Sequence, residues 1–139
     1  MRPYEIIEHT AEIGVRAYGG NLEELFAHMA QGMFSLIVPP EEVQPQTSFT
    51  LKVNSDSLDR LMVAWLRELL FLFDTKRFLG RIFQVRFTDS LSLEATVSGE
   101  DLEFERHHVD KEVKAVTYCD LSVTQNPDGT WVSQVIFDI

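Results

Sequence analysis

The sequence predicts an α+β domain, a two-layer sandwich in which two helices cover one face of a mostly antiparallel sheet. Two stretches of helical length carry apolar residues at helical spacing. Most other stretches alternate apolar and polar residues with period two, and turn-forming residues separate them. Strands joined by tight turns run antiparallel. The 139 residues contain no repeat or linker, so we expect one domain over residues 1–139.

Two helices are expected. The first begins at Asn21, a helix-capping residue, and Glu24 completes a capping box three residues later. Its apolar stripe consists of Leu22, Leu25, Phe26, Met29, Met33 and Phe34. The second helix runs from about residue 57 to residue 73, and its apolar face is so wide that we expect it to be largely buried.

The strands are predicted from alternation and from turn residues. The expected strands cover residues 13–17, 49–53, 83–87, 91–97, 113–123 and 131–137. A turn near Asp89 makes a hairpin of the third and fourth strands. Pro127 and Gly129 suit the turn that joins the last two, because proline presets the turn and glycine accepts a positive φ.

Charge and composition exclude several classes of protein. Twelve Lys and Arg against 22 Asp and Glu give a net charge of −10. This balance argues against binding of nucleic acid through phosphates and against an anionic membrane surface, and it fits a partner that is a cation or a basic protein. The basic residues after the second helix are expected to blunt a solvated hairpin edge, with a small RNA contact as the alternative: Lys76, Arg77, Arg81 and Arg86.

The cysteine count and the first residues bear on location. A single cysteine, Cys119, excludes an internal disulfide and a site of several thiolates. The N-terminal residues lack the apolar stretch of a signal peptide. The longest near-apolar stretch, residues 69–73, is too short to span a bilayer. We therefore expect a cytoplasmic protein.

Most candidate catalytic groups have a structural explanation. Cys119 is expected in mid-strand as an inert small hydrophobic residue rather than a nucleophile. His107 and His108 are adjacent, so on a strand their side chains point to opposite faces and do not easily share a metal unless the chain turns there. The acidic residues at 100–105 are expected in a solvated loop, and the alternative is a surface for a cation or a basic partner.

Carboxylates at the two chain ends are more informative. Glu12 stands at the step into a strand, and Asp138 is next to the α-carboxylate of Ile139. If the last strand is ordered to its end, these anions repel, and a hard cation such as Ca²⁺ or Mg²⁺ would offset the repulsion. The alternative is a frayed terminus with solvated charges.

Several segments resemble the archease family, in the same order along nearly the whole chain. They are residues 9–14 (HTAEIG), 21–26 (NLEELF), 65–73 (WLRELLFLF), 99–100 (GE), 106–107 (RH), 112–118 (EVKAVTY) and 135–139 (VIFDI). Each segment alone is a weak signal, whereas the ordered set with its terminal Phe-Asp-Ile is specific.

The resemblance implies an archease-like fold with a strand-helix-strand-strand module, and a protein that is not itself an enzyme. Archeases are partners of the RtcB-type RNA ligase, which joins tRNA halves with GTP and divalent metal. They promote ligase guanylylation and multiple turnover in tRNA splicing or RNA repair. We therefore expect a non-catalytic ligase activator.

The resemblance also implies a metal site at the chain ends. Carried over by position, its ligands are Glu12, Asp138 and Ile139, with Ca²⁺ or another hard cation such as Mg²⁺ or Mn²⁺. Two departures from the family stand out: Glu12 replaces an Asp, and Cys119 stands where many members have His. Glu103, where the family often has Asp, is a third.

Two other functions remain as alternatives. One is a general protein-interaction or chaperone-like module with several clients. The other is a metal-dependent hydrolase built on Glu12, Asp138 and His9, for which the sequence offers no convincing nucleophile and base.

Overall fold

A computed structural model describes residues 2–8 and 11–139 of the chain. It contains two α-helices, α1 (Leu22–Ile37) and α2 (Leu58–Lys76), and a short 3-10 helix, η1 (Pro40–Glu42). The strands are β1 (Tyr4–Glu8), β2 (Glu12–Gly19), β3 (Thr47–Asn54), β4 (Phe78–Asp89), β5 (Ser92–Asp101), β6 (Ala115–Val116), β7 (Ser122–Gln125) and β8 (Trp131–Asp138). No helix in this described part is long and apolar enough to cross a membrane.

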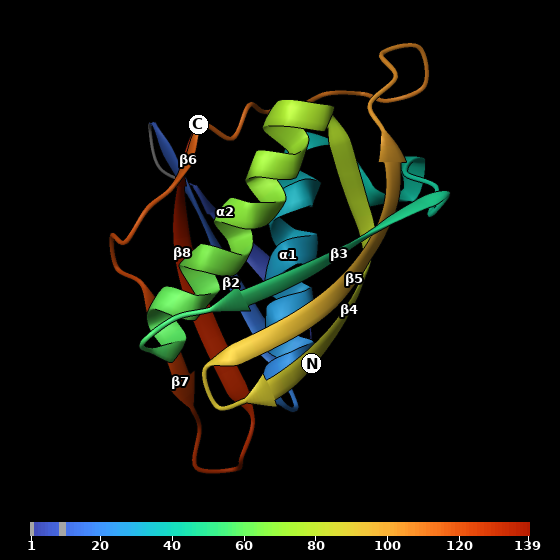
Figure 1. Cartoon of the computed structure of the whole chain (residues 1–139). Coiled ribbons are helices and arrows are strands. Elements are labelled where there is room, and N and C mark those ends of the chain that lie inside the picture. The colour runs from blue at the N-terminus through green and yellow to red at the C-terminus, as the bar shows by residue number, and fades with distance from the viewer. Residues whose placement is uncertain (1, 9–10) are drawn as a thin grey trace.

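The strands form two antiparallel sheets with the helices between them (Figure 1). The larger sheet has the order β1-β2-β8-β6, and β7 also pairs with β8; the smaller sheet has the order β3-β5-β4. Helix α1 packs against β2 in one sheet and β4 in the other, which explains why it is buried on several sides. The α+β class, the two helices and the antiparallel pairing are confirmed. The sequence did not distinguish the two sheets.

Helix α1 begins as predicted. The Asn21 side chain accepts the Glu24 N–H at 2.8 Å, and Glu24 accepts the Gly20 N–H at 3.0 Å, which completes the capping arrangement. Gly32 lets this helix approach β2, since a Cβ there would lie 2.6 Å from the Val15 side chain.

Helix α2 extends three residues beyond its predicted end. The Ser57 side chain accepts the Arg60 N–H, and the helix stops where Arg77 adopts a left-handed conformation with φ 57°. Trp65 is fully buried, and its indole N–H donates to the Phe26 carbonyl of α1 at 3.0 Å. The two helices are thereby tied together inside the core.

The strand predictions were correct for the hairpins and wrong for one segment. β4 and β5 form the predicted hairpin, and the Asn126 N–H donates to the Thr130 carbonyl across the turn before β8. The predicted strand at 113–123 is instead two short strands, β6 and β7, separated by a turn. Strand β1 was not predicted.

Candidate functional site

The register of β2 and β8 brings the two chain ends together. Glu12 begins β2, Asp138 ends β8, and the two residues are direct partners in the antiparallel ladder. Directly opposed side chains have Cβ atoms about 5 Å apart. The next residues inward, Ile13 and Phe137, are also paired and point into the core, so Glu12 and Asp138 project from the outer face of the sheet.

The end of the chain is ordered by contacts on both sides. The Lys114 N–H donates to the Asp138 carbonyl at 2.8 Å, and the Ile139 N–H donates to the Ala11 carbonyl at 3.3 Å. The Ile139 side chain is partly buried and packs against the core. The alternative of a frayed terminus is therefore wrong, because β8 is a central strand paired up to Asp138.

The carboxylates of Glu12, Asp138 and Ile139, which we call the carboxylate corner, place several negative charges close together. Two side-chain carboxylates lie opposite each other, and the α-carboxylate of Ile139 follows Asp138 directly. None of the ion pairs formed by the described residues involves any of these three groups. Like charges placed directly opposite on a sheet are destabilising. The donor set, all carboxylate oxygen, fits a hard divalent cation such as Ca²⁺.

The described side chains alone do not complete a metal cage. No group of three His, Cys, Asp or Glu side chains gathers in the ranges 2–8 and 11–139. The set at the chain ends has two such side chains, Glu12 and Asp138, and its third carboxylate belongs to the main chain. His9, the third residue of the hydrolase alternative, lies outside the described residues.

Cys119 lies in an exposed turn, so the mid-strand prediction was wrong. The Asp120 carboxylate raises the pKa of the Cys119 thiol above its ordinary value, and burial, Glu12 and Asp138 add to the rise. The negative charges of Glu12 and Asp138 in the carboxylate corner therefore act on the Cys119 thiol. A raised pKa keeps it protonated, which is the opposite of an activated nucleophile.

The acidic run holds a buried ionic cluster that sequence reasoning missed. Glu100 is 4% exposed, and its carboxylate accepts hydrogen bonds from the Arg106 guanidinium, the Gln44 N–H and the His107 ring. The bonds from Arg106, Gln44 and His107 lower the pKa of the Glu100 carboxyl to about 2, against the opposing effect of burial. The expectation of a wholly solvated acidic loop was wrong for Glu100.

His107 and His108 lie in a loop rather than on a strand, and their side chains have different partners. The His107 ring is buried, and its Nδ1 accepts the Glu103 N–H at 2.9 Å, so Nε2 carries the proton that is donated to Glu100. The His108 side chain is exposed and contacts Glu42. The two rings thus contact different carboxylates, Glu100 and Glu42.

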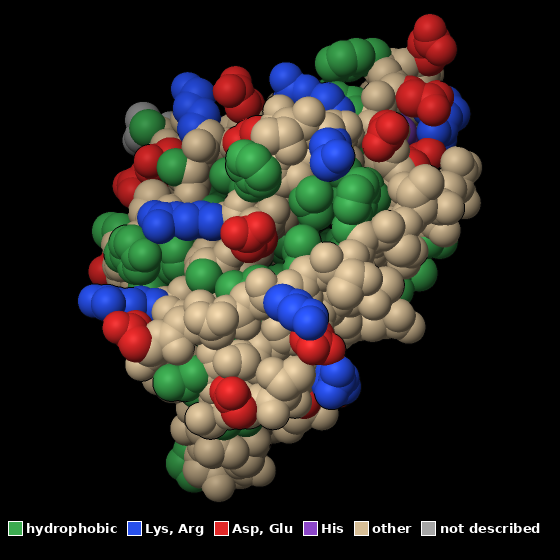
Figure 2. Space-filling view, in the orientation of Figure 1, with side chains coloured by type: hydrophobic (Ala, Val, Ile, Leu, Met, Phe, Trp, Pro, Cys, Tyr) green, Lys and Arg blue, Asp and Glu red, His purple; other side chains and the backbone are tan. Residues whose placement is uncertain are grey.

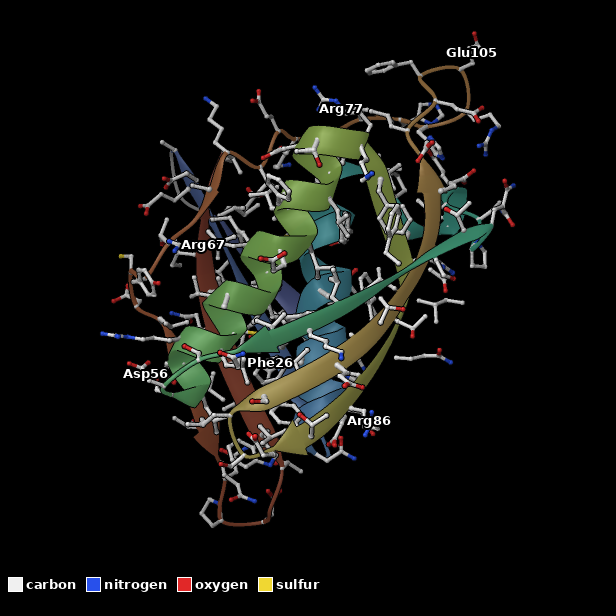
Figure 3. The ribbon with its side chains drawn as sticks, viewed as in Figure 1. Phe26, Asp56, Arg67, Arg77, Arg86 and Glu105 are labelled. Atoms are coloured by element: carbon white, nitrogen blue, oxygen red, sulfur yellow. The ribbon has the colours of Figure 1, made fainter. Side chains whose placement is uncertain are left out.

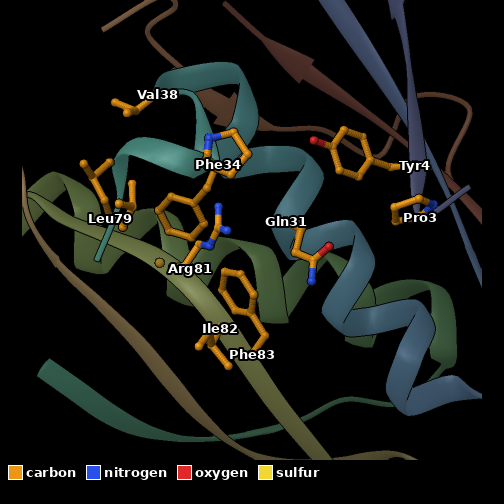
Figure 4. A pocket seen from close by; sticks show the side chains of 12 residues that line it. Pro3, Tyr4, Gln31, Phe34, Val38, Leu79, Arg81, Ile82 and Phe83 are labelled. Atoms are coloured by element: carbon orange, nitrogen blue, oxygen red, sulfur yellow. The ribbon is translucent and has the colours of Figure 1, made fainter. Parts of the chain in front are cut away.

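A pocket of about 440 Å³ opens between β1, α1 and β4, away from the carboxylate corner (Figure 4). Phe34, Phe83 and Leu79 supply apolar walls, and Gln31 and Arg81 supply polar groups. Its described lining residues include no Asp, Glu, His, Cys or Ser. The three residues named for the hydrolase alternative, His9, Glu12 and Asp138, are not among these lining residues.

Comparison with known proteins decides the family. The model of the archease protein family matches residues 4–139. The chain belongs to the archease family. It is 38% identical to protein archease of Thermococcus gammatolerans over 142 residues, which cover all of both chains. It is also 38% identical to protein archease of Methanosarcina mazei, covering 99% of this chain and 97% of that one.

Solved structures agree with the archease assignment. The solution structure of protein 1598 of Methanobacterium thermoautotrophicum superposes with a TM-score of 0.88 at 33% identity, covering both chains completely. The crystal structure of a Thermotoga maritima protein described as an archease and possible chaperone gives a TM-score of 0.65 at 18% identity. It covers all of this chain and 98% of that one, and it supports the fold alone. In this chain, the carboxylate corner lies at the end of the central strand β8.

Proposed function

We propose that this archease is a non-catalytic activator of an RtcB-type RNA ligase and promotes ligase guanylylation and multiple turnover in tRNA splicing or RNA repair. Family membership and the pairing of Glu12 with Asp138 beside the chain end are the support for the proposal. The pairing carries the most weight, because it joins both ends of the chain into one anionic site.

The carboxylates of Glu12, Asp138 and Ile139 are the groups that would hold a divalent cation, Ca²⁺ or another hard ion such as Mg²⁺ or Mn²⁺. A bound cation would supply a positive charge that offsets their repulsion, with further positions open to oxygen ligands. Glu12 is one methylene longer than the Asp of the family motif, and it still offers a carboxylate at the first position of β2. Backbone hydrogen bonds on both sides hold the main chain at Asp138 in place.

Activation of the ligase then requires only that this protein binds one ligase conformation more tightly than another. A ligase with two conformations shifts toward the one that the activator binds more tightly. The net charge of −10 favours rapid encounter with a basic RNA-binding protein, and added salt would slow that encounter.

The test is ligation under multiple turnover. The cognate ligase is mixed with broken RNA, GTP and metal, and this protein is added below the ligase concentration. We expect many ligations per ligase with the wild-type chain and about one with Asp138→Ala. A ligase that turns over equally without this protein would contradict the proposal.

Two observations favour a second candidate, a chaperone-like module with several protein clients. The Thermotoga maritima relative is described as a possible chaperone, and Phe71, Phe104 and Tyr118 are exposed apolar side chains of the kind that contact other proteins. Suppression of the aggregation of several unrelated proteins, without any effect on the ligase, would favour this candidate.

A further inference from the structure

One loop of the molecule carries an aromatic side chain in water. Phe104 is 80% exposed, the largest fraction among the exposed large hydrophobic residues of the described chain. It stands between Glu103 and Glu105 in the loop that follows β5. Figure 1 shows this loop projecting from the body of the protein, and Figure 3 labels Glu105 at its tip.

The tip is a closed turn. The backbone N–H groups of Arg106 and His107 both donate to the Glu103 carbonyl, at 3.0 and 2.9 Å. The Arg106 guanidinium contacts the Glu103 carboxylate at 3.1 Å and also binds Glu100 below the turn. The Phe104 backbone is therefore enclosed by a turn whose two sides are bonded to each other.

The base of the loop is fixed by buried groups. The His107 ring is buried and bonds both the Glu103 backbone and the Glu100 carboxylate. The Leu102 N–H donates to the Arg77 carbonyl at the end of α2, and the Asp110 N–H donates to the Ile37 carbonyl at the end of α1, both at 2.8 Å. Both ends of the loop are thus attached to helices of the core.

This construction holds an apolar ring in solvent, where it contributes little to folding. Burial of such a ring in a partner is favourable, and a loop that is already ordered loses little conformational entropy on binding. Aromatic anchors that enter a partner's pocket commonly dominate binding energy. The loop has the properties of a preorganised docking element.

The surrounding charge indicates the chemistry of the partner. Glu105 follows Phe104 in the loop and Asp101 ends β5 just before it, and both are exposed. The ion pairs of Arg106 are with Glu100 and Glu103. Figure 2 shows carboxylates crowded at this corner beside an exposed hydrophobic side chain. A complementary surface has an apolar socket with lysine or arginine side chains at its rim.

We propose that Phe104 is a docking anchor that inserts into an apolar, basic-rimmed socket on a protein partner. The inference rests on the proposed function, under which that partner is the RNA ligase. The anchor is separate from the carboxylate corner, so docking and activation depend on different residues.

The test is direct binding to the immobilised ligase at several salt concentrations, with ligase stimulation measured in parallel. Phe104→Ala should raise Kd about tenfold or more, without changing the melting temperature, because the ring is exposed. Phe71→Ala is the matched control, since it removes an equally large ring that is 62% exposed on α2, and its Kd should remain that of wild type. Glu105→Gln should slow association, with a smaller effect at high salt.

The outcomes separate the two proposals. If the wild-type chain binds and stimulates the ligase while Phe104→Ala keeps the wild-type Kd, the docking inference is overturned and the proposed function stands. If the wild-type chain does not bind the ligase, both are overturned. A tenfold loss with Phe71→Ala and none with Phe104→Ala also overturns the inference.

Discussion

Glu12 and Asp138 come from opposite ends of the chain and face each other across the β2–β8 ladder. The backbone on both sides of Asp138 is hydrogen-bonded, so the carboxylates do not separate by fraying. These two carboxylates face each other at the end of the β2–β8 ladder, and their repulsion destabilises the fold locally. The proposed cation would offset this repulsion, and the effects of its binding can be measured.

Asp138→Asn is expected to change stability in opposite directions with and without Ca²⁺. In chelator the variant should unfold at a slightly higher temperature than wild type, because opposed like charges cost about 0.2–1 kcal/mol. Ca²⁺ at about 100 times its Kd should stabilise the wild-type chain by about 2.7 kcal/mol, or about 10 °C.

Calorimetry of both proteins checks this prediction. Glu23→Gln is the charge-matched control, since Glu23 lies in the first turn of α1, beyond the other end of β2, and its Ca²⁺ response should equal that of wild type. An equal Ca²⁺ response in Asp138→Asn would contradict the metal site.

Cys119 is a reporter of the same corner that does not depend on the ligase. Its thiol pKa is raised by Asp120 first and also by Glu12 and Asp138. A cation bound by these last two acids would lower the pKa, increase the thiolate fraction at pH 8 and speed alkylation. Ca²⁺ should therefore accelerate reaction with iodoacetamide in wild type and have no effect in Asp138→Asn. Equal rates with and without Ca²⁺ in wild type would count against binding there.

Glu100 is expected to make stability depend on pH in the acid range. Its pKa falls from 4.5 to about 2 on folding, so its contribution is complete above about pH 5 and is lost as the pH falls toward 2. Glu100→Gln should cost on the order of 2–3 kcal/mol at pH 7 and progressively less on acidification. Urea unfolding between pH 7 and pH 2.5 tests this, and parallel curves for the two proteins would refute it.

Gly99 is expected to tolerate no side chain. A Cβ at this position would lie 1.8 Å from the Leu79 carbonyl oxygen of β4, which is backbone and cannot move aside without disturbing the β4–β5 pairing. Gly99→Ala should destabilise the protein by at least about 3 kcal/mol. Gly20→Ala is the control, because its Cβ would have ordinary contacts only. Equal melting temperatures for both variants would show that the strands can separate there.

Local signals predicted the elements that local chemistry determines. Asn21 and Glu24 marked the start of α1, and the residues around Gly129 marked the last turn, because caps and turns depend on a few neighbouring side chains. The pairing of Glu12 with Asp138 was not visible locally. Its two residues drew attention as anions at the ends of predicted strands and, through the archease resemblance, as metal ligands.

The errors have physical causes. Residues 113–123 alternate like a strand, but Asp120 adopts a left-handed φ of 50° and the Thr117 hydroxyl accepts the Cys119 N–H, which replaces the ladder with a turn. The division into two sheets depends on which strands meet across the chain. Burial of Glu100 follows from its partner Arg106, and a run of acids gives no sign of which member is buried.

Guanylylation of the ligase in a single turnover tests the proposed function most directly. The cognate RtcB-type ligase is incubated with GTP and divalent metal, and the covalent guanylate is followed over time with wild type, Asp138→Asn or Glu23→Gln at substoichiometric amounts. We predict faster accumulation with wild type and Glu23→Gln, and the unassisted rate with Asp138→Asn. Equal acceleration by Asp138→Asn would contradict a role for the carboxylate corner, and no acceleration by the wild-type chain under any metal would contradict ligase activation itself.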